Sequence, residues 1–375
     1  MGWRIAGGQV LQDGTLDPGE LHLAGGVIAK AGGGRSFDAT GLLVMPGLID
    51  IHGDAHERSI QPRPGIGFPM GFAVRDAASQ LLGLGITTAY MGVTLSWEPG
   101  LRSLEAWRGL MAALDAAKPA IDLRVHLRFE ADNLDALPDA LADIAAGRVH
   151  LIGFNDHTPA ILKKLGNPKE VAKYAGRAGL TPEAFRTLIE GVAAKRGEVP
   201  ATRRKLAEAA AARGLPMLSH DDATLEDRAL FRGLGARICE FPMAEEVAAD
   251  ARAAGEHVVM GAPNVVRGGS HLGWASAAPL AERGLVTVLA SDYHWPALLE
   301  APFAMARRGK MSLAAAWDLV SANPAAAAEL SDRGRLAEGL RGDVVVIDPA
   351  GPHVVAVFCG GELAHLGAGG ARRLG

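Results

Sequence analysis

The sequence predicts an α/β protein: a distorted (β/α)8 barrel of the TIM type, with a small β-sandwich domain that both chain ends form. The chain has 375 residues, roughly two and a half times the length of an average domain of about 150 residues. Its middle part alternates short apolar runs with Ala- and Leu-rich helical segments, which is the pattern of repeated βα units. Its two ends show only β patterns broken by turn residues.

The two chain ends carry the expected strands of the smaller domain. Apolar stretches alternate there with Gly- and Pro-containing turns. The stretches are Trp3 to Val10, Leu21 to Leu23, Val27 to Ala31, Asp343 to Asp348 and His353 to Cys359. We therefore expect residues 1–45 plus 338–375 to form the β-sandwich domain and residues 46–337 to form the barrel.

Eight apolar runs supply the number of strands that closes such a barrel. They are Leu43 to Ile51, Ile86 to Val93, Ile121 to Glu130, His150 to Phe154, Pro216 to Ser219, Arg237 to Phe241, His257 to Met260 and Thr287 to Ala290. Helical periodicity fills the intervals between them. The stretch from Thr158 to Pro200 is too long for one βα connection, so we expect inserted helices over the barrel mouth.

The composition excludes several classes of protein. Lys and Arg number 38 against 42 Asp and Glu, a net charge of -4, so no global basic field exists for nucleic acid. The only two cysteines, Cys239 and Cys359, support neither a disulfide framework nor a thiolate zinc site. No signal-peptide pattern and no apolar run of about 18 residues occurs. We expect a cytoplasmic protein that binds neither nucleic acid nor a membrane.

Residue types that bind metals follow five of the predicted strands, at the barrel end where chemistry is built. They are His52, Asp54 and His56 after the first strand, Glu130 after the third, His157 after the fourth, His220 after the fifth and Asp292 after the eighth. Imidazole and carboxylate ligands without thiolates suit zinc, or a similar first-row ion, in a catalytic site with one position open to water.

The supply of ligands exceeds the needs of one ion, so we expect two divalent metal ions, with zinc preferred. His52, Asp54 and Asp292 would hold one ion, His157 and His220 the second, and Glu130 would bridge both. A shared carboxylate offsets the repulsion between ions about 3.5 to 4 Å apart, and Asp292 would be the catalytic base that takes a proton from the activated water. The role of His56 stays open, and we expect His126, deeper on the face of Glu130, to make a hydrogen bond.

The chain resembles the amidohydrolase superfamily over its whole length. The segments Val44 to His52 and Gly339 to Val345 are similar to the usual boundaries between the barrel and the β-sandwich domain of that superfamily. The resemblance implies a hydrolase that carries one or two metals. Many members bridge their metals with a carboxylated lysine, but no Lys ends a predicted strand here, so the variant with a Glu bridge fits.

Four further segments resemble a family of diphosphatases in phosphonate catabolism: Gln61 to Pro64, Ser219 to Thr224, Met260 to His271 and Ser291 to Tyr293. This resemblance implies hydrolysis of the α–β phosphoanhydride of alpha-D-ribose 1-methylphosphonate 5-triphosphate, or a close analogue, to the 5-phosphate and pyrophosphate. The implied partner is a phosphorylated sugar, and an association with components of a carbon–phosphorus lyase stays open. Analogy with the superfamily favours a homo-oligomer.

Several residues are candidates for binding this substrate. Arg267 and Ser270 lie in the Gly-rich run after the seventh strand, where barrels commonly hold phosphate. Arg63 and Arg128 could clamp further phosphates by two-pronged contacts. Three more candidates, Asp222, Asn264 and His271, lie in the segments that carry the resemblance.

Two positions depart from the diphosphatase pattern and leave the substrate open. His56 stands where that family has an apolar residue, and Trp274 where it has a small polar one. The first alternative is an amidohydrolase that acts on a C–N bond: a deacetylase, D-aminoacylase or cyclic amidase with the same metals. The second is a non-catalytic metabolite-binding subunit of a lyase complex, which the retention of every expected ligand disfavours.

Overall fold

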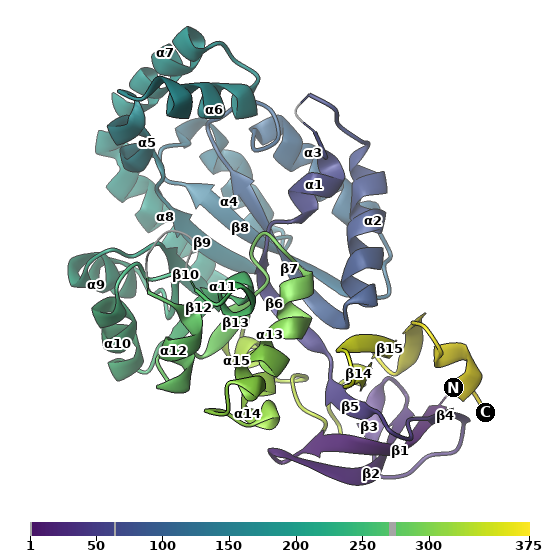
Figure 1. The fold of residues 1–375 in the computed structure, drawn as a ribbon. Coiled ribbons are helices and arrows are strands. Elements are labelled where there is room, and N and C mark those ends of the chain that lie inside the picture. Colours follow the sequence, from purple (N-terminus) through teal and green to yellow (C-terminus); the bar gives the residue numbers. More distant parts are fainter. Residues whose placement is uncertain (1, 64, 270–274) are drawn as a thin grey trace.

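The barrel is built from parallel strands in chain order. A computed structural model describes residues 2–63, 65–269 and 275–375, and within these ranges eight strands form one sheet that runs from β6 to β13 (Figure 1). They are β6 (Leu48–Gly53), β7 (Ile86–Leu95), β8 (Asp122–Glu130), β9 (Leu151–Asn155), β10 (Met217–His220), β11 (Ile238–Glu240), β12 (His257–Gly261) and β13 (Val288–Ala290). A bridge between Gly53 and Asp292 joins the two edges. The predicted (β/α)8 barrel is confirmed.

Apolar side chains fill the interior of the barrel below the strand ends. Ile49, Tyr90, Leu218 and Val259, from four different strands, belong to one buried cluster. All ten residues of β7 are buried, because helices cover the outer face of a parallel sheet while side chains pack its inner face. Polar side chains are therefore left for the carboxyl ends of the strands.

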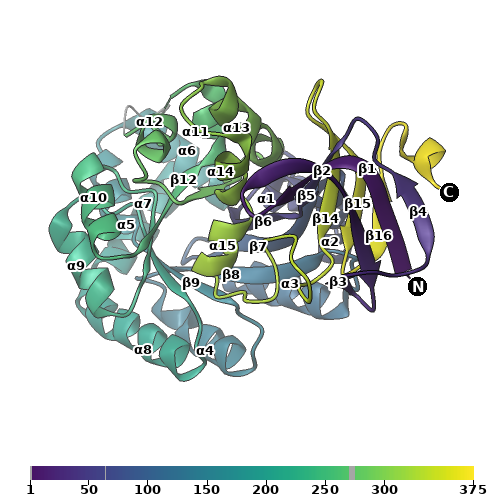
Figure 2. The same cartoon turned by 90° about the horizontal axis from the view of Figure 1, so that it is seen from below.

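Helices surround the strands, as the view along the barrel shows (Figure 2). They include α2 (Met70–Gly83), α3 (Leu104–Ala116), α4 (Leu137–Ala145), α8 (Val199–Ala212), α9 (Leu225–Gly233), α10 (Glu245–Ala253), α12 (Ala277–Glu282), α13 (Pro296–Arg307), α14 (Leu313–Asp318) and α15 (Ala322–Ala327). Three of these helices, α3, α9 and α14, begin with a side-chain cap. The Ser103 hydroxyl accepts a hydrogen bond from the backbone N–H of Ala106 at 3.2 Å, and Thr224 with Asp227 forms a capping box.

The expected inserted helices follow the fourth barrel strand. They are α5 (Thr158–Lys164), α6 (Pro168–Ala178) and α7 (Pro182–Ala193), which lie together at one end of the molecule (Figure 1). Asn167 and Thr181 cap α6 and α7 directly before a proline, the usual residue at a first helical position. Ile161, Val171 and Phe185 give the insertion its own apolar cluster.

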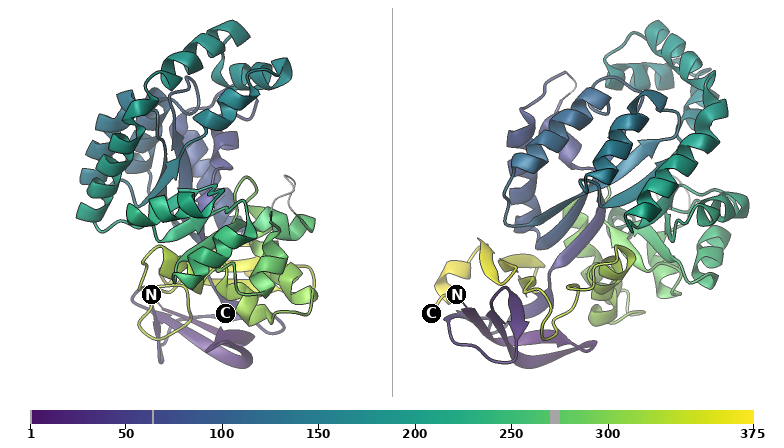
Figure 3. Two further views of the ribbon diagram at one scale, coloured as in Figure 1. Left: turned by 90° about the vertical axis from the view of Figure 1, so that its left-hand side faces the viewer. Right: turned by 180° about the vertical axis from the view of Figure 1, so that it is seen from behind.

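Both chain ends meet in a second, mixed sheet, at the opposite end of the molecule from the insertion (Figure 3). It contains β1 (Gly2–Gln12), β2 (Thr15–Ala24), β3 (Val27–Ala29), β4 (Arg35–Asp38), β5 (Leu43–Pro46), β14 (Val344–Asp348), β15 (His353–Cys359) and β16 (Glu362–Leu366). Trp3 of β1 and Phe358 of β15 are three strands apart in the sheet order, yet their ring centroids are 5.3 Å apart. The sheet therefore curls so that its two halves face each other across an apolar core.

The run from Leu43 to Ile51, expected to be one strand, is two strands in two different sheets. β5 pairs with β14 in the mixed sheet, whereas β6 begins the barrel. Gly47 stands between them, and a Cβ atom there would lie 2.2 Å from Oγ1 of Thr87. The chain crosses from one sheet to the other at a point where only glycine fits.

Within the described ranges, no helix combines the length and the apolar character that crossing a bilayer requires. Cys239 and Cys359 are both free thiols, and both are buried.

Candidate active site

The first candidate metal group joins the two edge strands of the barrel. His52 is the next-to-last residue of β6, Asp54 follows that strand and Asp292 follows β13. Ligand atoms of these three residues lie within 4.8 Å of one another. The backbone N–H of Asp292 donates to the carbonyl of His52 at 2.8 Å, and the backbone N–H of Asp54 donates to the carbonyl of Asp292 at 3.0 Å. Barrel closure itself thus brings the three predicted ligands together.

The second group comes from the opposite side of the barrel mouth. Ligand atoms of His157, His220 and Asp221 lie within 4.8 Å of one another. Glu130 adjoins this group: it accepts a hydrogen bond from the backbone N–H of His157 at 3.1 Å and also contacts the His157 imidazole. Asp221, which the sequence analysis did not select, has a left-handed backbone with φ 59°. The bridging role of Glu130 stays a prediction.

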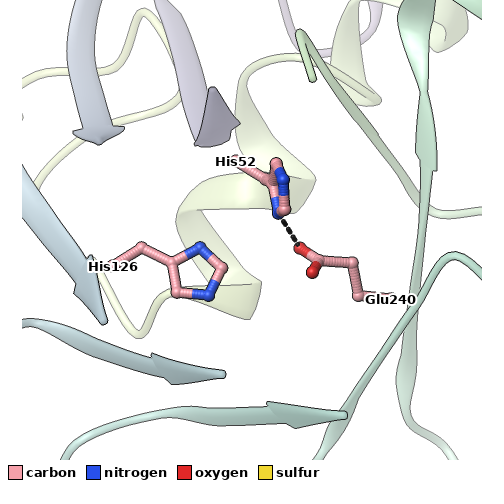
Figure 4. Close-up of side chains that lie close together, drawn as sticks. All are labelled: His52, His126 and Glu240. Atoms are coloured by element: carbon pink, nitrogen blue, oxygen red, sulfur yellow. Dashed lines mark ion pairs between the residues drawn. The ribbon is translucent and has the colours of Figure 1, made fainter. Parts of the chain in front are cut away.

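A third group lies deeper in the barrel and contains an acid that the sequence analysis missed. Figure 4 shows the rings of His52 and His126 on one side of the Glu240 carboxylate, from β6, β8 and β11. Ligand atoms of the three lie within 4.8 Å of one another. One Glu240 oxygen is 2.8 Å from Nδ1 of His52, and the other is 2.8 Å from Nδ1 of His220. Glu240 therefore connects the ligands of both candidate metal groups.

Buried atoms in this region fit a metal centre. In the described part of the chain, both ring nitrogens of His52 and of His126, and Oε1 of Glu240, are buried without a hydrogen-bond partner. The 2.8 Å approach of His52 to Glu240 lacks hydrogen-bond geometry. Buried polar atoms are normally paired, and nitrogen and carboxylate ligands without thiolates are what zinc accepts in catalytic sites. The residues present thus suit the divalent ions that the sequence predicts.

The protonation states of His52 and His220 suit ligation as well, whereas the neighbouring Glu130 carboxylate raises the pKa of His157. Burial, reinforced by the charge of Arg128, lowers the pKa of His52 to about 3. Burial also lowers the pKa of His220 to about 4. Both imidazoles are neutral near pH 7, and the neutral ring is the form that binds metal. Burial opposes the ionisation of Glu130, but the neighbouring His157 outweighs it and lowers the pKa of that carboxyl to about 2.

Asp292 differs from the other carboxyl groups. Burial, followed by the negative charge of Asp54, raises the pKa of Asp292 to about 7. Its backbone is left-handed, with φ 54°, and its carboxyl lies within 4.8 Å of ligand atoms of Asp54 and His52. Strained backbone of this kind is concentrated at functional sites.

The Arg128 guanidinium lies between the first two groups. It donates to Oδ2 of Asp54 at 3.2 Å, and its other terminal nitrogen lies 3.3 Å from Nε2 of His220. The side chain is almost fully buried, so its charge acts in a region of low dielectric, where charge–charge interactions are strong. Arg128 was predicted to clamp phosphate, and it faces the site directly.

A cavity of about 730 Å³ opens beside these groups. Asp54, Glu130, His157 and His220 line its floor, and residues of the inserted helices α5 and α6 line its wall. Of the predicted substrate-binding residues, Arg128 and Asp222 line this cavity. The Asp222 carboxylate is also engaged within the barrel wall, where it accepts hydrogen bonds from Ser219 at 2.6 Å and from Arg228 at 3.2 Å.

The remaining predicted substrate residues lie elsewhere or outside the described ranges. Arg63, Asn264 and Arg267 are not part of the cavity lining. The Asn264 side chain accepts a hydrogen bond from the backbone N–H of Ala277 at 3.0 Å, and Nη1 of Arg267 lies 3.5 Å from the Tyr293 hydroxyl. Ser270 and His271, like Trp274, lie outside the described residues.

The two undecided histidines occupy different places. His56 is buried at the start of α1 (His56–Ile60), where it lines a small void with Val93 and Trp107 rather than the large cavity. His126, expected to make a hydrogen bond in the core, belongs to the third group, and neither of its ring nitrogens has a hydrogen-bond partner in the described part of the chain.

Comparison with known proteins identifies related chains. No family model matches the sequence. The chain is 33% identical over 329 residues, which are 85% of this chain and 87% of its relative, to alpha-D-ribose 1-methylphosphonate 5-triphosphate diphosphatase of Escherichia coli (strain K12).

Solved structures share the fold at low sequence identity. An amidohydrolase gives a TM-score of 0.63 at 15% identity over 98% of this chain and 100% of its own. A triazine hydrolase variant gives a TM-score of 0.66 at 15% identity over 96% of this chain and 94% of its own. The beta-aspartyl dipeptidase of Fervidobacterium islandicum AW-1 gives a TM-score of 0.61 at 14% identity over 98% of this chain and 99% of its own. The chain therefore shares the fold of an amidohydrolase and belongs to the family of the Escherichia coli alpha-D-ribose 1-methylphosphonate 5-triphosphate diphosphatase.

Proposed function

We propose that this protein hydrolyses the α–β phosphoanhydride of alpha-D-ribose 1-methylphosphonate 5-triphosphate, or of a close analogue, to the 5-phosphate and pyrophosphate. The observation that carries the proposal is the cavity in which candidate metal ligands and basic side chains face one another. The 33% identity with a diphosphatase of this specificity supports the same reaction. A phosphoanhydride is an anionic substrate, and the basic side chains of the cavity match it.

The candidate ligands divide between two divalent ions, with zinc preferred. His52, Asp54 and Asp292 would hold one ion, and His157, His220 and Asp221 the other, with Glu130 adjoining the second. Bound divalent ions would supply Lewis acidity toward the phosphate oxygens and would make a water molecule acidic near neutral pH. Glu240 would orient His220, because one of its oxygens pairs with Nδ1 of that ring and leaves Nε2 for ligation. Its other oxygen lies 2.8 Å from Nδ1 of His52.

The protein side chains would act on the reacting atoms as follows. The oxygen of a water molecule bonds to the α phosphorus, and the bond from that phosphorus to the bridging oxygen breaks. The electron pair of the broken bond leaves with pyrophosphate, and Asp292 accepts the proton of the attacking water at a carboxylate oxygen. The Arg128 guanidinium, held beside Asp54 and His220, offsets negative charge that develops on the phosphate.

Isotope labelling tests this reaction directly. The purified full-length protein, with its metal content measured, is incubated in 18O-labelled water with the ribose 5-triphosphate substrate, and the products are followed by phosphorus NMR. We expect release of pyrophosphate with the label in the sugar 5-phosphate, because the water attacks the α phosphorus. Label in pyrophosphate would contradict attack at that atom. Cleavage of amide substrates without release of pyrophosphate would favour C–N hydrolysis, and a metal-free protein inactive on both would favour a binding subunit.

A further inference from the structure

The cavity beside the metal-ligand groups has basic residues of two kinds. Each of the four arginines that line it has a carboxylate partner among the described residues. The pairs are Arg102 with Glu57 at 2.8 Å, Arg128 with Asp54 at 3.2 Å, Arg177 with Glu98 at 2.9 Å and Arg203 with Asp156 at 2.8 Å. Three of these guanidinium charges are therefore already balanced within the protein, and Arg128 shares its partner Asp54 with the first candidate metal group.

Two lysines in the same lining are not balanced in this way. Lys163 and Lys164 form the last turn of α5, and in the described part of the chain neither makes an ion pair with a carboxylate. Nζ of Lys164 lies 3.4 Å from the Tyr174 hydroxyl, and the Tyr174 ring stacks on Phe185 in the core of the insertion. The Tyr174 hydroxyl thus positions Lys164 but cannot neutralise the positive charge of its ammonium group.

The carboxylates of the cavity do not neutralise the positive charges of Lys163 and Lys164. Asp54 and Asp221 belong to the candidate metal groups, and Glu130 contacts His157. The side chain of Asp227 accepts backbone N–H groups at the start of α9. Two lysines at the end of a helix also stabilise its C-terminus, but that role does not require both residues to line the cavity of the metal ligands. Their shared cavity points to an anionic ligand.

We propose that Lys163 and Lys164 form a subsite for the terminal phosphates of a polyphosphorylated substrate and hold the pyrophosphate as it leaves. This inference rests on the proposed function, and it names the part of the protein that recognises the leaving group. It places that recognition on the inserted helix α5, whereas the sequence analysis placed phosphate binding on the Gly-rich run after the seventh strand. The sugar and its phosphonate would then occupy the side of the cavity away from α5.

The spacing along α5 fits this arrangement. His157 is the residue immediately before the helix, at its N-cap position, and it belongs to the second metal group. Six or seven residues at a rise of about 1.5 Å each place the lysine Cα atoms roughly 9 to 10.5 Å further along the axis. Long, flexible lysine side chains can reach back over part of that distance. A substrate cut at the metal groups would carry its outgoing phosphates toward these lysines.

The insertion is fixed to the barrel, so the subsite has a defined position. Arg196, which follows α7, donates to Asp156 at the end of β9 at 2.9 and 2.8 Å. Arg203 of α8 donates to the same carboxylate at 2.8 Å. Because Asp156 directly precedes His157, these ion pairs hold the start of α5 against the metal group.

The test compares two lysine variants with the wild-type protein. Lys163→Gln/Lys164→Gln removes both charges and keeps most of each side chain, and Lys169→Gln, on the exposed start of α6 and outside the cavity lining, is the matched control. Binding of inorganic pyrophosphate is measured by calorimetry on metal-loaded protein, at one fixed concentration of free zinc. We expect the double variant to bind pyrophosphate at least about tenfold more weakly, a loss that corresponds to about 1.4 kcal/mol, and the control to bind as the wild type does.

Salt dependence and kinetics complete the test. Binding to wild type should weaken with added salt, and this dependence should be smaller in the double variant, since exposed charges are screened. KM for the triphosphate should rise about tenfold in the double variant. Unchanged pyrophosphate binding in a folded double variant would overturn the subsite. If neither the wild type nor any variant hydrolyses the triphosphate, the proposed function is wrong. In that case, weaker pyrophosphate binding by the double variant would still support the subsite.

Discussion

Asp54 and Asp292 lie side by side because the barrel closes between them: the backbone N–H of Asp54 donates to the Asp292 carbonyl at 3.0 Å. This hydrogen bond spans the edge strands β6 and β13, which come from opposite ends of the barrel sequence. The proximity of the two carboxylates raises the pKa of Asp292 in addition to the larger effect of burial. Two adjacent carboxylates of this kind are costly to bury unless a cation accompanies them.

The first prediction concerns Asp292. Replacing it by Asn keeps the shape of the side chain but removes the proton acceptor, so kcat should fall by about 100-fold or more, with the melting temperature close to that of the wild type. Steady-state release of pyrophosphate measures the effect. Asp348→Asn, at the end of β14 in the mixed sheet, is the control and should retain full activity. A variant at Asp292 with wild-type kcat would remove this residue from the role of base.

The second prediction concerns Glu240, which contacts Nδ1 of both His52 and His220. Glu240→Gln removes the negative charge that pairs with His220 and lies beside His52, and metal affinity should fall by about 10- to 100-fold. Dialysis against buffered zinc, followed by metal analysis, gives the affinity without an activity assay. Glu226→Gln, on the exposed first turn of α9, should bind metal as the wild type does. Equal affinity of the Glu240 variant and wild type would show that His52 and His220 need no such partner.

The third prediction concerns the amino end of β8, away from the site. Asp122 accepts hydrogen bonds from Arg333 at 2.7 Å and Arg124 at 3.0 Å. Burial opposes its ionisation, but Arg124 and Arg333 outweigh burial and lower its pKa below the usual 3.8. A carboxyl whose pKa is lower in the folded state stabilises the fold above its unfolded pKa, and this stabilisation disappears as the pH falls through the folded pKa.

Arg333→Gln should therefore lower the free energy of unfolding at pH 7 by about 2 kcal/mol and by clearly less at a pH below the folded-state pKa of Asp122, where this carboxyl is protonated. Urea unfolding at the two pH values measures both losses. Arg335→Gln, whose exposed side chain lies 3.6 Å from Asp318, should change stability little. Equal losses for Arg333→Gln at both pH values would refute a charge-dependent contribution.

The fourth prediction concerns Gly47, where the chain passes from the mixed sheet into the barrel. Gly47→Ala would place Cβ 2.2 Å from Oγ1 and 2.5 Å from Cγ2 of Thr87, so it should destabilise the protein by about 1 to 3 kcal/mol. Thr87→Ala removes both of these atoms, and in the double variant the loss should be smaller than the sum of the single losses. Thermal unfolding of the wild type, the two single variants and the double variant measures these losses of stability. If the two single losses simply add up in the double variant, there is no steric clash between the two positions.

Much of the site could be predicted because, in a barrel, residues at the ends of different strands lie close together. His52, Glu130, His157, His220 and Asp292 each follow an apolar run, and parallel strands bring their carboxyl ends to one edge. Glu240 was missed because the expected run from Arg237 to Phe241 continues one residue past it, so that Glu240 did not stand at a predicted strand end, whereas the strand itself ends at Glu240. Its pairing opposite His220 in adjacent strands depends on register, which one sequence does not reveal.

The fold was predictable where local patterns decide the structure and less so where the tertiary structure does. Alternating apolar and helical segments predicted the barrel strands, but the division of Leu43 to Ile51 between two sheets depends on the packing of Gly47 against Thr87. The insertion could be placed over the mouth from its length alone. Which of its lysines line the cavity depends on the orientation of α5 relative to the barrel, and helical periodicity does not determine that orientation.

The closure of the barrel also limits which fragments of the chain can form the complete site. The backbone N–H of Ser291 donates at 3.0 Å to the carboxylate of Asp50, 241 positions earlier. A fragment that stops short of β13 lacks one wall of the barrel together with Asp292, so the first metal group is incomplete until nearly four-fifths of the sequence is present. A chain truncated before Asp292 should accordingly be unable to complete this group, so any shortened form that keeps the site must extend at least through β13 to Asp292.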